Sequence, residues 1–217
     1  MKRLTKLLAI LLALLISSTT ITFAAAPTKW SDEEDIVFVY DDAGNLLSSI
    51  DFDYEYDAFN QLTKVKAKGG RVVAEYFYDD TGTRIKKVEY DTEGKETITY
   101  YPSKNFVRVI DDAGVRDTVY YHDGQGLVAR KDSDGKKYFY HNDHLGSTSL
   151  VTDEAGNVVE RTDYEPFGLP ILGGESRYTF TGKEQDPTGL YYYESRYYDP
   201  FLMHFTQADT VIGDVYD

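Results

Sequence analysis

Only a few side chains have the types and spacing of a metal or catalytic centre. His141, Asp143 and His144 lie within four positions, and His122 is the nearest other histidine. Imidazole and carboxylate groups are ligands for zinc and iron. No second compact cluster completes such a site, and the His-Leu-Gly-Ser context favours a turn that reorients a strand. We therefore expect structural hydrogen bonds from these residues, with metal binding as the alternative.

Four acidic runs raise the question of calcium, which binds carboxylate oxygens. They are Asp32-Glu33-Glu34-Asp35, Asp41-Asp42, Asp79-Asp80 and Asp132-Ser133-Asp134-Gly135. None has the alternating oxygen spacing of a dedicated calcium loop. We expect no cofactor here, only solvated turns whose charges discourage exposed strands from pairing with other chains. Ca²⁺ at these turns is the alternative.

The composition excludes several classes of protein. The 217 residues include no cysteine, so disulfides and thiolate sites cannot form. A net charge of −14 argues against nucleic-acid binding, which needs a Lys/Arg surface. Tyrosine is unusually frequent, with 20 residues, and it favours strands. The composition therefore favours an all-β fold.

The N-terminus resembles a secretory signal peptide. Lys2, Arg3 and Lys6 precede an aliphatic run from Leu7 to Ile16, and small residues follow at 24–26. We expect a signal helix over 1–26, cleavage after Ala24 or Ala26, a linker over 27–37 and a secreted or cell-surface protein. A membrane anchor is the alternative, although the second half of the uncharged stretch is Ser, Thr and Ala. After cleavage no membrane span is expected.

A repeat organises the rest of the chain. Tyr40-Asp41-Asp42-Ala43-Gly44 recurs as Tyr56-Asp57-Ala58-Phe59-Asn60, as Tyr78-Asp79-Asp80-Thr81-Gly82 and as Tyr90-Asp91-Thr92-Glu93-Gly94. The Asp-x-x-Gly part returns at 111–114, 123–126, 132–135 and 153–156. An aspartate at the first position of a turn bonds its own backbone, and Gly or Asn supplies the positive φ that closes it. Each unit therefore predicts strand, turn, strand.

Residues between these turns alternate with the period of two that strands require. Ala74, Tyr76 and Tyr78 share one face, and Glu75 lies on the other. Helical periodicity is absent after the N-terminal segment. We predict an all-β protein, a long antiparallel meander of roughly 14 to 18 strands.

Five motifs, in order along the second half of the chain, resemble those of the Rhs/YD-repeat proteins and their RHS-associated core. They are Asp143-His144-Leu145-Gly146-Ser147, Tyr164-Glu165-Pro166-Phe167-Gly168, Phe180-Thr181-Gly182-Lys183-Glu184, Thr188-Gly189-Leu190-Tyr191-Tyr192 and Arg196-Tyr197-Tyr198-Asp199-Pro200. The resemblance implies YD-repeat strands over 38–139, the core region over 140–210 and a tail over 211–217. It assigns these motif residues a structural role.

The resemblance also implies a fold. Members of this family wind their strands into a hollow shell that often encloses a toxin, so we expect a curved, open part of such a shell. In its thin wall, tyrosine rings would pack across strands with their hydroxyls toward water. Family members continue beyond the position of Asp217 with a plug and a toxin. We therefore expect a truncated gene product, a fragment of a longer locus, or a small member of the family. Such a chain would self-associate, or pair with another shell chain, through open strand edges.

Asp199 and Asp209 are the sharpest catalytic candidates. The resemblance implies a self-cleaving aspartyl protease made of two such aspartates, with Arg196 before the first. The spacing of ten residues is kept, but Met203-His204 and Ala208 depart from the family pattern. We expect a non-catalytic structural, encapsulating or interaction protein. The alternatives are autoproteolysis through Asp199 and Asp209, and an extracellular module that binds a glycan or a protein partner through its tyrosine-rich strands.

Overall fold

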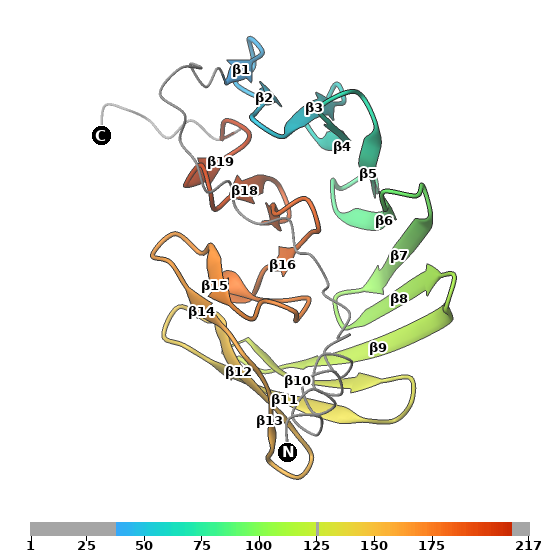
Figure 1. The fold of residues 1–217 in the computed structure, drawn as a ribbon, viewed down its shortest axis with the longest axis vertical. Coiled ribbons are helices and arrows are strands. Elements are labelled where there is room, and N and C mark those ends of the chain that lie inside the picture. The colour runs from blue at the N-terminus through green and yellow to red at the C-terminus, as the bar shows by residue number, and fades with distance from the viewer. Residues whose placement is uncertain (1–37, 125, 210–217) are drawn as a thin grey trace, which may run out of the picture. The chain divides into compact units, whose positions relative to one another are not determined.

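The computed structural model describes residues 38–124 and 126–209 (Figure 1). All of them belong to the unit Ile36–Asp217. The signal peptide predicted over 1–26, the linker over 27–37 and the tail over 211–217 lie outside the described residues. In the described part the chain forms nineteen strands and one short 3₁₀ turn, and no helix there is long and apolar enough to cross a membrane. The all-β prediction is confirmed.

Thirteen strands form one antiparallel sheet in which each strand pairs with the next in sequence. They are β1 (Val39–Tyr40), β2 (Leu46–Ser48), β3 (Phe52–Tyr56), β4 (Leu62–Ala67), β5 (Val72–Tyr78), β6 (Arg84–Tyr90), β7 (Glu96–Ser103), β8 (Phe106–Asp111), β9 (Gly114–His122), β10 (Leu127–Asp132), β11 (Lys137–Asn142), β12 (Thr148–Asp153) and β13 (Val158–Arg161). This order is the predicted meander. The sheet stays open, because β1 and β13 at its two ends do not pair with each other.

The repeated Asp-x-x-Gly sequence closes most of the turns in the same way. In the β5–β6 turn, the Asp79 Oδ1 atom accepts the amides of Thr81 and Thr83, each at 2.9 Å. Gly82 donates its amide to the Asp79 carbonyl and has a φ of +84°. In the β3–β4 turn, Asn60 takes the glycine position with a φ of +60°. The turns therefore depend on local sequence alone.

Six short strands follow the large sheet and form two small sheets. Strands β14 (Asp163–Tyr164) and β15 (Pro170–Leu172) pair with each other. Strands β16 (Glu184–Gln185), β17 (Tyr191–Tyr192), β18 (Tyr197–Asp199) and β19 (His204–Phe205) form a four-stranded sheet. Within this unit, β1–β13 follow one another along an arc, and the small sheets lie on its inner side (Figure 1). The strand count exceeds our prediction because these C-terminal strands have only two or three residues.

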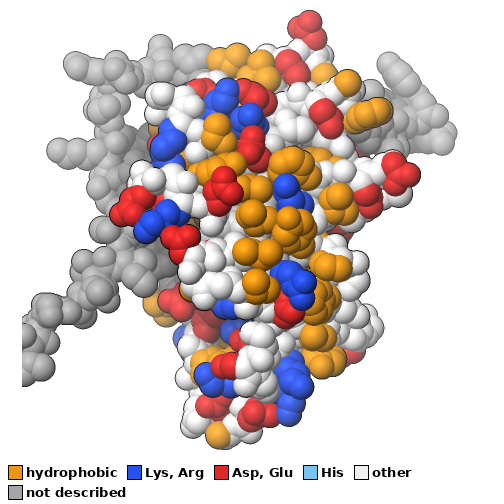
Figure 2. Space-filling model, turned by 90° about the vertical axis from the view of Figure 1, so that its right-hand side faces the viewer, with side chains coloured by type: hydrophobic (Ala, Val, Ile, Leu, Met, Phe, Trp, Pro, Cys, Tyr) orange, Lys and Arg blue, Asp and Glu red, His pale blue; other side chains and the backbone are white. Residues whose placement is uncertain are grey.

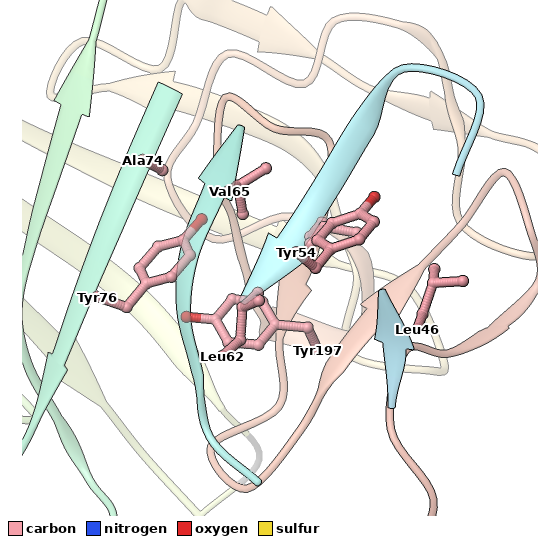
Figure 3. Close-up of a cluster of buried hydrophobic side chains, with 8 residues drawn as sticks. Leu46, Tyr54, Leu62, Val65, Ala74, Tyr76 and Tyr197 are labelled. Atoms are coloured by element: carbon pink, nitrogen blue, oxygen red, sulfur yellow. The ribbon is translucent and has the colours of Figure 1, made fainter. Parts of the chain in front are cut away.

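Buried side chains join the large sheet to the four-stranded sheet. Leu46, Tyr54, Leu62, Val65, Ala74 and Tyr76 from β2–β5 pack with Leu190 and Tyr197 (Figure 3). The rings of Tyr76 and Tyr197 lie 5.0 Å apart, centroid to centroid. The prediction that tyrosine hydroxyls face water is therefore wrong for this face. The four-stranded sheet, to which Tyr197 belongs, packs against this face, so Tyr76 and Tyr197 are only 2% and 1% exposed.

The opposite face of the large sheet is open to solvent. Alternation places Phe77, Tyr100 and Val115 outward, and they are 41%, 37% and 58% exposed, whereas their neighbours Tyr76 and Thr99 are buried. Figure 2 shows hydrophobic side chains gathered in a band along this side of the molecule, with Lys and Arg beside them. One such contact joins the Lys86 ammonium to the Phe77 ring, 3.9 Å from its centroid. The sheet therefore has a covered inner face and a solvated outer face.

Candidate functional site

The Asp143–Ser147 motif forms the turn between β11 and β12, and this turn has the geometry of the YD-repeat turns. The Asp143 Oδ1 atom accepts the amides of Leu145 and Ser147, each at 2.8 Å. The Gly146 amide donates to the Asp143 carbonyl at 3.1 Å, and Gly146 has a φ of +83°. His144 and Leu145 are exposed at the tip. In this geometry the aspartate acts as a turn residue.

The same turn is the docking point for a later motif. The Ser147 side chain is fully buried, and its Oγ accepts the amide of Thr181 at 3.1 Å. The Thr148 amide donates to the carbonyl of Thr179, also at 3.1 Å. These bonds attach the Phe180–Gly182 turn to the large sheet. The two motifs therefore belong to one structural unit.

The histidines near this turn have separate partners. The His141 Nε2 atom lies 3.1 Å from Thr152 Oγ1, and the His122 Nδ1 atom lies 3.1 Å from Asn105 Oδ1. Within residues 38–124 and 126–209, no group of three or more His, Asp or Glu side chains is placed to hold a metal ion. The acidic runs at 41–42 and 79–80 lie in turns, where Asp41 and Asp79 accept backbone amides. The run at 32–35 lies outside the described residues.

The Pro166–Gly168 motif receives the hydroxyl groups of two tyrosines. Tyr191 donates to the Gly168 carbonyl at 2.9 Å, and Tyr198 donates to the Phe167 carbonyl at 3.0 Å. The Phe180 ring packs against Gly168 so closely that a Cβ atom there would lie 2.4 Å from it. This glycine is therefore required both by its φ of +91° and by the approach of the ring. Pro166 is exposed and begins the turn.

The remaining signature residues support the four-stranded sheet. Gly189 closes another turn by donating its amide to the Asp186 carbonyl at 2.8 Å, and Leu190, which follows it, is buried. Pro200 is buried at the end of β18. Gly182 closes the turn that begins at Thr179. Each core motif therefore contributes a turn or a buried contact.

A buried cluster of charged side chains is the most concentrated electrostatic feature of the described chain. Arg84 and Lys87 come from the inner face of β6, whereas Glu184 lies in β16 and Asp186 directly follows that strand. The Arg84 Nη1 atom lies 2.6 Å from Asp186 Oδ2, and its Nη2 atom lies 2.9 Å from Glu184 Oε2. The Lys87 Nζ atom lies 2.7 Å from Asp186 Oδ1 and 3.2 Å from Glu184 Oε1. All four side chains are at most 4% exposed.

Neighbouring groups complete this cluster. Arg177 pairs with Glu184, Tyr101 donates to Glu184 at 2.8 Å, and Glu89 lies 2.7 Å from Lys87. The Arg84 guanidinium carbon also lies 4.2 Å from the centroid of the Tyr192 ring. Three cations thus face three carboxylates among tyrosine rings, which is the balance that buried charges require.

The pKa shifts within this cluster follow from that balance. Burial alone would raise the pKa of Glu184, but Lys87, Arg177 and Arg84 outweigh burial and hold its pKa well below the usual range. Burial would lower the pKa of Lys87, yet Asp186 and Glu184 raise it. Burial raises the pKa of Glu89, because Lys87 offsets only part of the desolvation. Glu184 and Lys87 are therefore charged at neutral pH.

Sequence reasoning missed the cationic half of this cluster. Arg84 and Lys87 lie in a charged strand segment, Arg84-Ile85-Lys86-Lys87, that resembles a solvated surface strand. Glu184 was part of a recognised motif but had no assigned partner. The sequence does contain one indication, because a carboxylate within an aromatic motif needs a cation if it is buried. The residues near Glu184 in sequence do not identify which cation that is.

The three catalytic candidates are placed at the end of the four-stranded sheet. The Asp199 Oδ1 atom accepts the amides of Phe201 at 2.8 Å and Leu202 at 3.1 Å, so it caps the turn after β18. Asp209 pairs with Arg196, with 3.0 Å between Oδ2 and Nη2. The structure therefore brings Arg196 and Asp209 together and gives Asp199 different partners.

Comparison with known proteins identifies this arrangement. A family model described as teneurin YD-shell matches residues 27–215, most of the chain. The chain belongs to the teneurin YD-shell family. This confirms the resemblance to Rhs/YD-repeat proteins and the expected shell-type fold.

Relatives of this YD-shell chain are much longer proteins. The tRNA nuclease WapA of Bacillus subtilis (strain 168) is 36% identical over 184 residues, which are 80% of this chain and 8% of WapA. The toxin subunit YenC1 of Yersinia entomophaga is 32% identical over 169 residues, 72% of this chain and 16% of YenC1. Teneurin-m of Drosophila melanogaster is 25% identical over 172 residues, 75% of this chain and 6% of that protein. The chain thus spans less than a fifth of each of these relatives.

Solved structures share the fold. The crystal structure of TcdB2-TccC3 superposes with a TM-score of 0.69 at 19% identity, over 79% of this chain and 10% of that one. The complex TcdB2-TccC3-Cdc42 gives a TM-score of 0.70. The curved sheet with its inner small sheets is therefore a segment of a YD shell.

Proposed function

We propose that this YD-shell segment is a non-catalytic wall element, exported from the cell, that assembles with further shell chains or copies to enclose or present other molecules. The observation that carries the proposal is the open sheet, ordered β1 to β13, whose inner face is covered and whose end strands are each paired on one side only in the described part. An open sheet of this kind is built to be extended by more strands. The relative YenC1, which is named as a toxin subunit, supports a role outside the cell.

The non-catalytic part of the proposal draws on the site geometry. Autoproteolysis requires two carboxylates that share a proton. Asp199 instead caps a turn, and Asp209 is paired with Arg196. The nuclease activity in the name of WapA belongs to that protein, of which the present chain matches a small part.

Edge pairing can be tested through the backbone of β13. Thr162 donates its amide to Ser149 in β12, so the amide of Arg161, one residue earlier, faces away from the sheet. Arg161→Pro removes this outward donor. Thr92→Pro is the matched control, because proline suits the second position of the Asp91–Gly94 turn.

Light scattering after size-exclusion chromatography should detect dimers or larger assemblies of the unaltered chain and of Thr92→Pro. Arg161→Pro should shift the distribution toward monomer. A monomer at all concentrations, or three identical profiles, would contradict assembly through this edge.

Export can be tested by N-terminal sequencing of secreted material. Under this proposal the mature protein starts at Ala25 or Pro27. An intact Met1 on surface material would instead indicate an uncleaved anchor.

A further inference from the structure

A small cavity lies between two segments that are far apart in sequence. One is the connection of β2 to β3 around Asp51, and the other is the loop from Asp199 to Leu202 after β18. Its volume is about 120 Å³, well below that of a drug-sized ligand site. Phe52, Tyr54 and Leu202 form part of an apolar wall, and none of the described residues that line the cavity is Lys or Arg. The cavity fits one side chain, and the charged groups of its described lining are the carboxylates of Asp51 and Asp199.

Two carboxylates at this cavity have unused acceptor capacity. Asp199 uses Oδ1 for the amides of Phe201 and Leu202, while its Oδ2 atom has no hydrogen-bond or ion-pair partner among the described residues. The Asp51 carboxylate has no such partner in the described part of the chain either. The neighbouring Asp53, by contrast, is paired with Lys68. A cation from outside the described chain could pair with both Asp51 and Asp199.

We propose that this cavity binds a primary alkylammonium group, such as the side chain of a lysine from another polypeptide. An ammonium has three donors and can bridge single oxygens of two carboxylates, while its methylene chain packs on the apolar wall. A guanidinium prefers both oxygens of one carboxylate, so it would pair with Asp51 alone, because Oδ1 of Asp199 is already committed. Calcium would need six to eight oxygen ligands, more than the two carboxylates supply. This inference is independent of the shell role proposed above.

Charge at the cavity should make binding depend on pH. Burial raises the pKa of Asp199, the nearby Asp51 raises it further, and the two amide bonds and His204 oppose the change. Tyr54, the other titratable group among the described residues that line the cavity, stays neutral because burial raises its pKa. Binding of an ammonium should therefore strengthen as the pH rises from acidic to neutral.

The test is a titration of the ¹⁵N-labelled chain, followed by amide chemical shifts. n-Butylammonium represents the shared chemistry, and Nα-acetyl-lysine methylamide represents a lysine side chain. n-Butanol and n-butylguanidinium are the neutral and the guanidinium comparisons. We expect saturable shifts at residues 49–52 and 199–202 with the two ammonium probes. Asp51→Asn and Asp199→Asn should each weaken binding by about tenfold, and the exposed Asp112→Asn should not.

The outcomes separate the sources of the ligand. Binding of both ammonium probes supports a lysine side chain, and binding of n-butylammonium alone supports a free amine at the same site. Equal binding of n-butanol, tighter binding of n-butylguanidinium or unchanged affinity in Asp51→Asn would overturn the proposal. Asp51 lies in an exposed connection, so this variant remains informative if Asp199→Asn fails to fold.

Discussion

Arg84 and Asp186 are 102 residues apart in sequence, yet Arg84 Nη1 lies 2.6 Å from Asp186 Oδ2 and both side chains are buried. The contact joins β6 of the large sheet to the segment that follows β16. Hydrophobic packing of Tyr76 and Tyr197 next to it is not directional. The ion pairs therefore set the position of the four-stranded sheet on the arc.

Replacing Arg84 by Met should destabilise the protein by about 3–5 kcal/mol, because Asp186 and Glu184 would lose a buried partner. Urea denaturation measures this change in the free energy of unfolding. Arg108→Met is the control, since Arg108 pairs with Asp117 at the surface and its replacement should change the free energy of unfolding far less. Similar losses for the two variants would show that the buried cluster has no special structural role.

Stability should fall as the pH drops below 4.5, the ordinary pKa of a glutamate. The folded-state pKa of Glu184 is depressed, so its contribution is complete above 4.5 and is lost on the way down to the folded-state value. Glu89, whose pKa is raised, acts in a different range: it adds stability as the pH falls from its folded-state pKa to 4.5 and changes little below 4.5. Urea denaturation at pH 7, 4.5 and 3 measures the acid dependence.

Glu184→Gln should be less stable at pH 7 and show a weaker loss of stability between pH 4.5 and 3. An unchanged acid dependence in this variant would assign the effect to other carboxylates.

Gly168→Ala should lower the free energy of unfolding by about 3 kcal/mol. The reasons are that a Cβ atom would lie 2.4 Å from the Phe180 ring and that a φ of +91° is strained for alanine. Gly94 has a similar φ of +83°, but a Cβ atom there would meet nothing within 4 Å. Gly94→Ala should therefore lower the free energy of unfolding by only about 1 kcal/mol. Thermal unfolding of the two variants isolates the packing contribution. Equal losses would mean that the ring moves aside freely.

The purified protein should keep its mass for days at neutral pH, because Asp199 and Asp209 have separate partners. Intact-mass spectrometry provides the measurement, with Asp199→Asn and Asp209→Asn analysed in parallel. A fragment that forms in the unaltered chain and is missing from both variants would make the protein a self-processing enzyme.

The strand-turn-strand meander could be predicted from the sequence because its determinants are local. Asp79 and Gly82 are three residues apart, and both the side-chain bonds and the positive φ that close the turn arise within five residues. The same local rule extends to Asp143 and Gly146, which explains why that motif was correctly expected to form a turn.

Only the tertiary structure determined which charged side chains are buried and which partner each carboxylate has. Arg84 and Lys86 look alike in sequence, but the inner face of β6 turns Arg84 toward Glu184 and Asp186, while Lys86 lies on the solvated face against Phe77. Asp199 and Asp209 match the spacing of a catalytic pair, yet a turn and an ion pair gave them different partners. The physical reason is distance along the chain. Turn hydrogen bonds form within a few residues, whereas burial of a charge depends on a partner about 100 residues away, which only the folded sheet brings into contact.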